Sequence, residues 1–137
     1  MTLPQSAVAL LDDPKAYATV ITMNRNGTPH VTLVWIEAVD GVPSFNTAVG
    51  RVKDRNLTRD PRVIVSVVNP AGNGDYAVFY GQARVTEDGA IEQIDRLAKK
   101  YTRRERYNHQ PGETRIRVDI DVDRIGGRGP WVTATSA

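Results

Sequence analysis

The chain has 137 residues, of which 40% are hydrophobic and 25% are charged, and this composition predicts one soluble globular domain over residues 1–137. It has no cysteine and only two histidines, which excludes disulfides, thiolate nucleophiles, iron–sulfur clusters and histidine-rich metal cages, so no metal site is expected. The net charge is only +2, but five basic residues fall within 51–62 and six within 95–106, which indicates anionic ligands or solvated helix faces.

The sequence carries no membrane or secretory signal. Its uninterrupted apolar stretches are far shorter than the roughly 18 to 20 residues that span a bilayer. The N-terminal region also lacks a basic segment followed by a hydrophobic one of about 7 to 15 residues. We therefore expect a cytoplasmic protein without a membrane span.

The chain begins with a predicted short helix and a hairpin. Pro4 suits a first helical turn, and apolar residues recur at helical spacing until residues 12–14. Residues 17–23 are β-prone, and Asn26-Gly27 is the strongest short-range hairpin signal because both residue types tolerate positive φ. The partner strand is predicted at 29–38.

A second turn and a short helix follow. Asp40-Gly41 turns the chain into a predicted strand at 42–47, and the short connections predict a local three-stranded meander. Residues 51–60 predict a helix with Val52, Asn56 and Leu57 facing inward. Pro61 ends it, because the residue before a proline avoids the helical region.

The second half of the chain predicts three further strands and one longer helix. A β-branched strand at 63–68 and a strand at 76–86 flank a polar loop. Apolar residues at helical spacing predict a helix at 90–104, whose other face is basic. Residues 114–125 alternate apolar residues with Arg and Asp, which predicts a strand with one wet face. Six strands without a βαβ alternation indicate a mainly β, antiparallel α+β or barrel fold.

The sharpest local feature is a basic turn after the strand that ends near Asn46. Gly50 precedes Arg51, Lys53 and Arg55 at the start of the predicted helix. A helix N-terminus attracts anions, and two arginines one turn apart can form planar forks around a phosphate. The turn is thus a candidate phosphate cradle. Spacing alone is equally compatible with a solvent-exposed helix that carries local ion pairs.

Together these motifs resemble a known family. The segments that carry the likeness are Asn26-Gly27 with the strand after it, Asp40-Gly41 with Phe45-Asn46-Thr47, Arg51-Val52-Lys53-Asp54-Arg55-Asn56-Leu57, and Asp60-Pro61-Arg62. In this order they resemble the pyridoxamine 5'-phosphate oxidase-like flavin and deazaflavin oxidoreductases. The resemblance implies a six-stranded antiparallel split β-barrel of the FMN-binding type, and a homodimer that holds its cofactor in a groove shared by two subunits.

Within that family, the basic turn resembles the branch that uses coenzyme F420, the 8-hydroxy-5-deazaflavin of actinobacteria. FMN-binding oxidases typically carry a Ser-Arg-Lys turn and a basic residue at the end of the second strand. This chain has Arg51-Val52-Lys53 in the turn and apolar residues 34–36 in the strand. The resemblance implies that Arg51, Lys53 and Asn56 hold the phosphate of the cofactor tail and that residues 32–34 lie along the ring.

Further site residues are expected on the strands. For the cofactor, Thr32, Asn46 and Thr47 are candidate polar contacts, and Val34 is a candidate apolar contact beneath the ring. Trp35 and Tyr76 are candidates for the substrate side, although aromatic residues on strands are usually core residues. No catalytic residue is assigned, since hydride transfer is chemistry of the cofactor. A proton could come from solvent, His30 or Tyr76.

The resemblance thus implies an F420H2-dependent reductase that acts on an activated double bond in a small enone, lactone or quinone-like molecule. Two alternatives stay open: an FMN-binding oxidoreductase, and a non-enzymatic member that binds a cofactor or a haem-related tetrapyrrole. No phosphate-binding loop, serine nucleophile elbow or zinc spacing is present. No nucleic-acid-binding module is recognisable either, so nucleic acid is not an expected partner.

Overall fold

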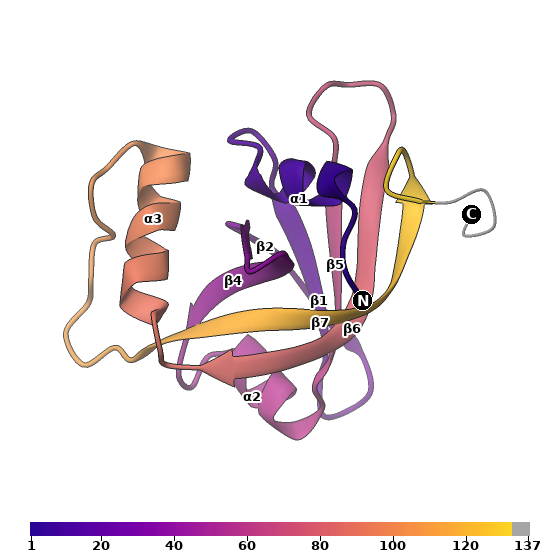
Figure 1. Cartoon of the computed structure of the whole chain (residues 1–137). Coiled ribbons are helices and arrows are strands. Elements are labelled where there is room, and N and C mark those ends of the chain that lie inside the picture. Colours follow the sequence, from indigo (N-terminus) through magenta and orange to yellow (C-terminus); the bar gives the residue numbers. More distant parts are fainter. Residues whose placement is uncertain (133–137) are drawn as a thin grey trace.

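The computed structural model of the chain describes residues 1–132 (Figure 1). Seven strands and three helices follow one another in this part of the chain. In chain order they are α1 (Gln5–Asp12), β1 (Ala18–Met23), β2 (Pro29–Val34), β3 (Glu37–Val39), β4 (Val42–Ala48), α2 (Val52–Arg59), β5 (Arg62–Val68), β6 (Tyr76–Thr86), α3 (Ala90–Thr102) and β7 (Arg115–Arg128). No helix within residues 1–132 is long and apolar enough to cross a bilayer.

All seven strands belong to one antiparallel sheet in the order β2-β1-β5-β6-β7-β4-β3. The sheet is curled, and its two longest strands, β6 and β7, run along the middle of it (Figure 1). Their pairing contains an irregularity between Tyr80 and Gly81. A bulge of this kind increases the local bend and twist, which helps a long sheet to curl. The fold is mainly β, with the three helices packed against the sheet.

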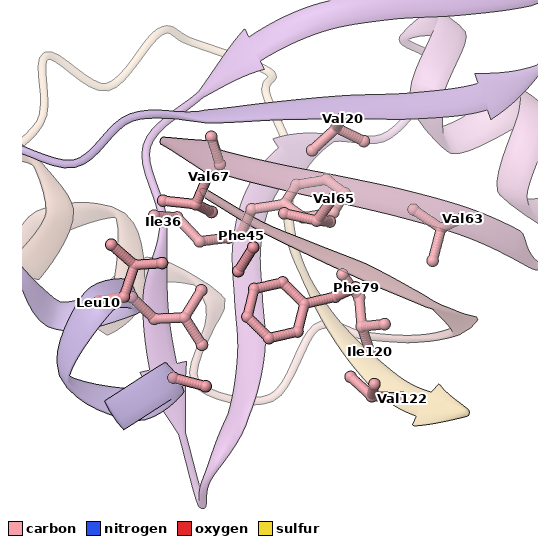
Figure 2. Packing of buried hydrophobic residues seen from close by; sticks show 14 of the residues in the cluster. Leu10, Val20, Ile36, Phe45, Val63, Val65, Val67, Phe79, Ile120 and Val122 are labelled. Carbon is pink, nitrogen blue, oxygen red and sulfur yellow. The ribbon is translucent and has the colours of Figure 1, made fainter. Parts of the chain in front are cut away.

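The hydrophobic core fills the inside of the curled sheet (Figure 2). Alternate residues of the strands point inward, and Phe45 and Phe79 are the largest side chains with no exposed surface. Helix α1 packs on β3 and β4 and places Leu10 and Leu11 against this core, as its apolar spacing predicts. Burying an aliphatic side chain of this size contributes about 1.5–3 kcal/mol. A helix as short as α1 is marginal on its own, so packing against the core stabilises it.

One predicted strand is divided in the structure, and the predicted meander is wrong. The segment 29–38 ends its first ladder at Val34 and starts a second one at Glu37, so β2 and β3 lie at opposite ends of the strand order. Between them the backbone N–H of Ile36 donates to the hydroxyl of Tyr101, and its carbonyl accepts from Nζ of Lys100. Side chains of α3 thus replace the ladder bonds, and the sheet gains a seventh strand.

The two predicted hairpin turns differ in their backbone conformation. Asp40 and Gly41 both have positive φ, at 50° and 78°, as a two-residue type I′ turn requires, and Val39 pairs with Val42. In the other turn Gly27 has a φ of 85°, whereas Asn26 does not have a positive φ. The Asn26 side chain instead accepts from the backbone N–H of Thr28 at 3.1 Å. That is the local bond that favours Asn in turns.

The wet face predicted for 114–125 is wrong at two positions. Arg115 and Asp119 of β7 are only 5% and 4% exposed. Helix α3 packs on this face of β4 and β7, so these side chains point under a helix instead of into water. Asp119 accepts from the hydroxyl of Ser44 at 2.6 Å, and that hydroxyl accepts from Nε2 of Gln93, which is also buried. A polar layer therefore joins α3 to the sheet, and its groups satisfy one another as burial requires.

Tyr101 holds the chain at the break between β2 and β3, and its removal is expected to destabilise the fold. Its hydroxyl donates to the carbonyl of Ala16 at 2.5 Å and accepts from the N–H of Ile36 at 3.2 Å. Tyr101→Phe leaves both backbone groups without this partner, which should lower the free energy of unfolding by about 1–3 kcal/mol. Urea unfolding of this variant beside Tyr76→Phe, at an exposed ring, measures the effect.

The same side chain predicts a pH dependence. Burial raises the pKa of Tyr101 to about 12 from its usual value of 10.0. Between these two values the folded state binds more protons than the unfolded state, so the free energy of unfolding should fall as pH rises through this window. Tyr101→Phe removes that contribution. Equal slopes for wild type and variant between pH 10 and 12 would contradict the assignment.

Candidate functional site

A groove of about 350 Å³ lies where β2, β4, α2, α3 and the segment before β7 meet. Its lining combines cationic, polar, aliphatic and aromatic side chains from seven parts of the chain. The lining residues are Tyr17, Leu33, Val34, Trp35, Asn46, Thr47, Arg51, Lys53, Ile94, Leu97, Tyr107 and Arg115. This volume is within the range of about 300–1,000 Å³ that small-molecule sites occupy.

Three cationic side chains gather at one end of the groove. Arg51 is the N-cap residue of α2, Lys53 lies in the first turn of that helix, and Arg115 begins β7. Nζ of Lys53 donates to Oγ1 of Thr32 at 3.2 Å. Burial lowers the pKa of Lys53, and the nearby charges of Arg51 and Arg115 lower it further. Such mutual repulsion makes this end of the groove favourable for an anion.

Arg115 is fixed in place by several contacts. Its Nε donates to Oδ1 of Asn46 at 2.8 Å and its Nη1 to Oε1 of Glu113 at 3.0 Å. The guanidinium also lies over the ring of Tyr107, at 4.9 Å from the ring centre. Asn46 is held in turn, because its Nδ2 donates to Oε1 of Gln93. The guanidinium is therefore pre-organised, so little side-chain entropy is lost when it contacts a ligand.

Thr47 carries a buried hydroxyl with no partner. The residue is 1% exposed, it lines the groove, and its Oγ1 forms no hydrogen bond with any residue of 1–132. Buried polar groups in folded proteins are nearly always hydrogen-bonded, and leaving one unpaired costs about 1–3 kcal/mol. The orphaned hydroxyl makes Thr47 a candidate contact for a polar atom of a ligand.

Aromatic side chains form a further part of the groove wall, next to the cations. The Trp35 ring stacks on Tyr101 at 5.7 Å between centroids, and Tyr107 meets Trp35 edge-on at 6.4 Å. Tyr107 lies in the segment between α3 and β7, and Asp95 fixes this segment against α3. Oδ1 of Asp95 accepts from the N–H of Tyr107 at 2.9 Å and lies 2.8 Å from Nε2 of His109. The groove thus offers a flat apolar surface next to a cationic end.

The structure brings most of the predicted site residues together. Val34, Trp35, Asn46, Thr47, Arg51 and Lys53 all line the groove, and Thr32 contacts Lys53. Asn46 was expected to contact the ligand, but its side-chain amide is already hydrogen-bonded within the protein. Its amide is engaged by Arg115, Gln93 and the carbonyl of Ala90, so it positions the arginine.

Two predicted residues of α2 lie outside this groove. Nδ2 of Asn56 donates to Oγ1 of Thr22 and to Oδ1 of Asn24, both at 3.0 Å, so the buried amide ties α2 to the first hairpin. Arg55 donates to the carbonyl of Gly50 and does not converge with Arg51. Positions 51 and 55 are one turn apart, but Arg51 is the N-cap residue, where the chain is extended rather than helical.

Both residues line a second, exposed hollow of about 680 Å³ on the other side of α2, here termed the basic hollow. Its lining residues are Asn24, Arg25, Val52, Asp54, Arg55, Asn56, Thr58 and Arg59. The N-terminus of α2 carries a carboxylate of its own, because Asp54 lies in the first turn and its Oδ2 accepts from the N–H of Gly50 at 2.8 Å. This negative charge opposes the expected phosphate site at the helix N-terminus.

The remaining candidates lie elsewhere. Tyr76 does not line the groove; the residue is 41% exposed on the outer face of β6. His30 of β2 is partly buried with Nδ1 unpartnered in the described chain, and it does not line the groove either. His109 is paired with Asp95 outside the lining.

Sequence reasoning missed Arg115, Glu113 and the aromatic residues Tyr17 and Tyr107. Arg115 alternates with apolar neighbours, which is the pattern of a solvated strand face. One signal was available: Gln93 lies on the apolar stripe of the predicted α3, so that stripe had to meet a polar partner. Nothing in the local sequence of Tyr107 marks it as a groove residue.

A family model and several solved structures are similar to this chain in sequence and fold. The family model described as pyridoxamine 5'-phosphate oxidase matches residues 3–125. A solved F420 reductase is 23% identical with a TM-score of 0.74, covering 86% of this chain and 94% of its own. A conserved hypothetical protein from Mycobacterium tuberculosis is 22% identical with a TM-score of 0.72, covering 100% and 96%. A haem-binding protein from Mycobacterium smegmatis is 17% identical with a TM-score of 0.69, covering 97% and 57%.

No curated protein matches the sequence. At these identities the likeness to the solved structures shows the fold alone, and their printed functions differ. The predicted split-barrel fold class is confirmed, with seven strands where six were expected. Because the family model matches most of the sequence, the chain belongs to the pyridoxamine 5'-phosphate oxidase-like family of split β-barrel proteins.

Proposed function

We propose that the groove binds coenzyme F420 and that the protein is an F420H2-dependent reductase of an activated double bond in a small enone, lactone or quinone-like molecule. One observation carries this proposal: a single groove is lined by three cations, by aromatic rings and by Thr47, whose buried hydroxyl has no partner within residues 1–132. That arrangement fits a ligand with an anionic tail and a flat head.

The residues of the cationic end fit the phosphate of such a cofactor. Lys53 supplies a mobile ammonium group, Arg115 a fixed guanidinium, and Arg51 a half-exposed one. The hydroxyl of Thr47 would gain the partner that it lacks. A charge-assisted hydrogen bond to phosphate contributes about 1.5–3 kcal/mol, so these groups together support binding of a phosphorylated ligand.

The aromatic part of the groove wall would orient the ring. Val34, Trp35 and Tyr17 give the groove an apolar surface on which a planar ring can lie, and Tyr107 reduces the access of water. When bound, the reduced deazaflavin supplies the hydride. No Asp, Glu or His is among the lining residues of the groove. Since neither His30 nor Tyr76 lines it, we assign the proton that completes the reduction to solvent.

The basic hollow favours F420 over FMN. Arg25, Arg55 and Arg59 outnumber its single carboxylate, Asp54, on the far side of the helix that carries Lys53. An oligoglutamate tail is polyanionic, so it is attracted by cations beyond the phosphate site, whereas FMN ends at its phosphate.

Titration of the apoprotein with oxidised F420 and with FMN tests the proposal. We expect F420 to bind at least tenfold more tightly than FMN, and we expect Arg55→Met to weaken F420 binding several-fold while leaving FMN binding unchanged. F420H2 oxidation with cyclohexenone or menadione then tests the reductase activity. Tighter binding of FMN would favour the flavin alternative. Binding of F420 without turnover of any substrate would favour a non-enzymatic carrier.

We further propose that the protein is a homodimer and that the second copy covers the outer face of β2, β1, β5 and β6. Exposed apolar side chains lie on these strands, namely Val31 and Leu33 of β2 and Val68 of β5. Leu33 also lines the groove, so a chain seated on this face would add to the groove wall. Light scattering after size exclusion should give twice the mass of one chain, and a monomer mass would contradict this.

A further inference from the structure

Glu113 pairs with both arginines of the cationic end, although it is not itself among the lining residues of the groove. Its Oε2 lies 3.3 Å from Nη2 of Arg51, and its Oε1 lies 3.0 Å from Nη1 of Arg115. The side chain is only 13% exposed, so both oxygens are largely withdrawn from water. The bridge is the arrangement that an oxyanion of a ligand would adopt between two guanidinium groups.

The two arginines depend on Glu113 to different degrees. Arg115 has Asn46 and the Tyr107 ring as further partners, and its side chain is 3% exposed. It therefore keeps its place without the carboxylate. The side chain of Arg51 is 50% exposed, and Glu113 is its only ion-pair or side-chain hydrogen-bond partner within residues 1–132. Because water reaches the half-exposed guanidinium of Arg51 and screens its charge, a ligand can replace the carboxylate there.

We infer that Glu113 is an internal competitor for the anion site, which a cofactor phosphate must displace from Arg51. The inference rests on the function proposed above, and it adds a residue that lets the groove discriminate between ligands by their charge. With Glu113 in place, the three cations of the groove keep a net charge of +2. A multiply charged phosphate attracts Arg51 more strongly than one carboxylate does, whereas a singly charged anion does not. The groove is thus selective for phosphate over simple carboxylates.

Glu113→Gln tests the inference. If Glu113 competes with the ligand for Arg51, the variant binds phosphate more tightly; if Glu113 only positions Arg115, the variant binds phosphate equally or more weakly. The amide can still accept a hydrogen bond from Arg115 but carries no charge. We expect the variant to bind inorganic phosphate about tenfold more tightly than wild type in calorimetric titrations. We also expect its preference for phosphate over acetate to fall. Glu92→Gln, at an exposed position of α3 without an ion pair in the described chain, changes the net charge equally and should leave both affinities unchanged.

The dependence on Arg51 gives a second readout. Arg51→Ala should weaken phosphate binding more in the Glu113→Gln background than in wild type, since only there is the guanidinium free of an internal partner. Phosphate binding that is unchanged or weaker in Glu113→Gln would overturn the inference and make Glu113 a positioning residue for Arg115. Absence of phosphate binding in wild type and in both variants would instead overturn the proposed anion site itself.

Discussion

Replacing Lys53 by methionine is expected to weaken binding of F420 by about 10- to 100-fold. Nζ of Lys53 is half-buried at the cationic end, and its only hydrogen-bond acceptor within residues 1–132 is the hydroxyl of Thr32. Losing one charge-assisted hydrogen bond to phosphate costs about 1.5–3 kcal/mol. Methionine has a similar length and is apolar, so the helix should fold normally. Fluorescence titration of the deazaflavin measures the dissociation constant.

Lys99→Met is the matched control for this change. Lys99 lies on α3, its side chain is 66% exposed, and its nearest carboxylate is Glu105 at 3.9 Å. Its removal lowers the net charge by the same amount without touching the groove, so affinity should change by less than about twofold. Equal losses in the two variants would show that the cofactor responds to overall charge and not to a built site.

A pH profile makes the Lys53 test sharper. Burial, followed by the charges of Arg51 and Arg115, lowers the pKa of Lys53 below its usual 10.5. Only the protonated amine attracts phosphate, so wild-type affinity should fall as pH rises through this lowered pKa. Lys53→Met lacks that fall. A wild-type affinity that stays constant up to pH 10.5 would contradict the role given to the amine.

Gly81→Ala is expected to lower the free energy of unfolding by about 3 kcal/mol or more. A Cβ at this position would lie 2.1 Å from the carbonyl oxygen of Asp121 and 3.0 Å from the Cα of Val122, both in the neighbouring strand. Backbone atoms of a central strand cannot move aside cheaply, so β6 and β7 would have to separate at the bulge. For a domain of this size the melting temperature should fall by roughly 10 °C.

Gly126→Ala gives the comparison within the same pair of strands. The nearest atom to a Cβ there is Cε2 of Tyr80 at 3.4 Å, the edge of a ring that can shift slightly. We expect a change of less than about 1 kcal/mol in either direction. Similar melting temperatures for the two variants would mean that the close approach at Gly81 is not what shapes the long β6–β7 pair.

Much of the fold follows from local sequence. Runs of β-prone and β-branched residues bounded by turn signals predict most strands, and Asp40-Gly41 predicts a turn that is of type I′ in the structure. The break between β2 and β3 could not be predicted, because residues 29–38 are suited to a strand throughout. It depends on Tyr101 and Lys100, which meet the backbone of Ile36 only after the chain has folded back over more than 60 residues.

The candidate site was predictable only in part, for a similar reason. Arg51 and Lys53 are close together in the sequence and follow a turn, so their clustering is visible without a structure. Arg115 reaches them from the other end of the chain through the pairing of β4 with β7. Arg55 shows the converse error, because a short spacing along α2 did not bring it to the same side as Arg51.

The central claim is that the cationic end of the groove holds the anionic part of a flat redox cofactor. A crystal structure of the protein with oxidised F420 tests it most directly. We predict the phosphate within hydrogen-bond distance of Nζ of Lys53 and Oγ1 of Thr47, with the ring beside Val34 and Trp35. A phosphate bound at Arg25 and Arg59 in the basic hollow, with the groove empty, would contradict the claim.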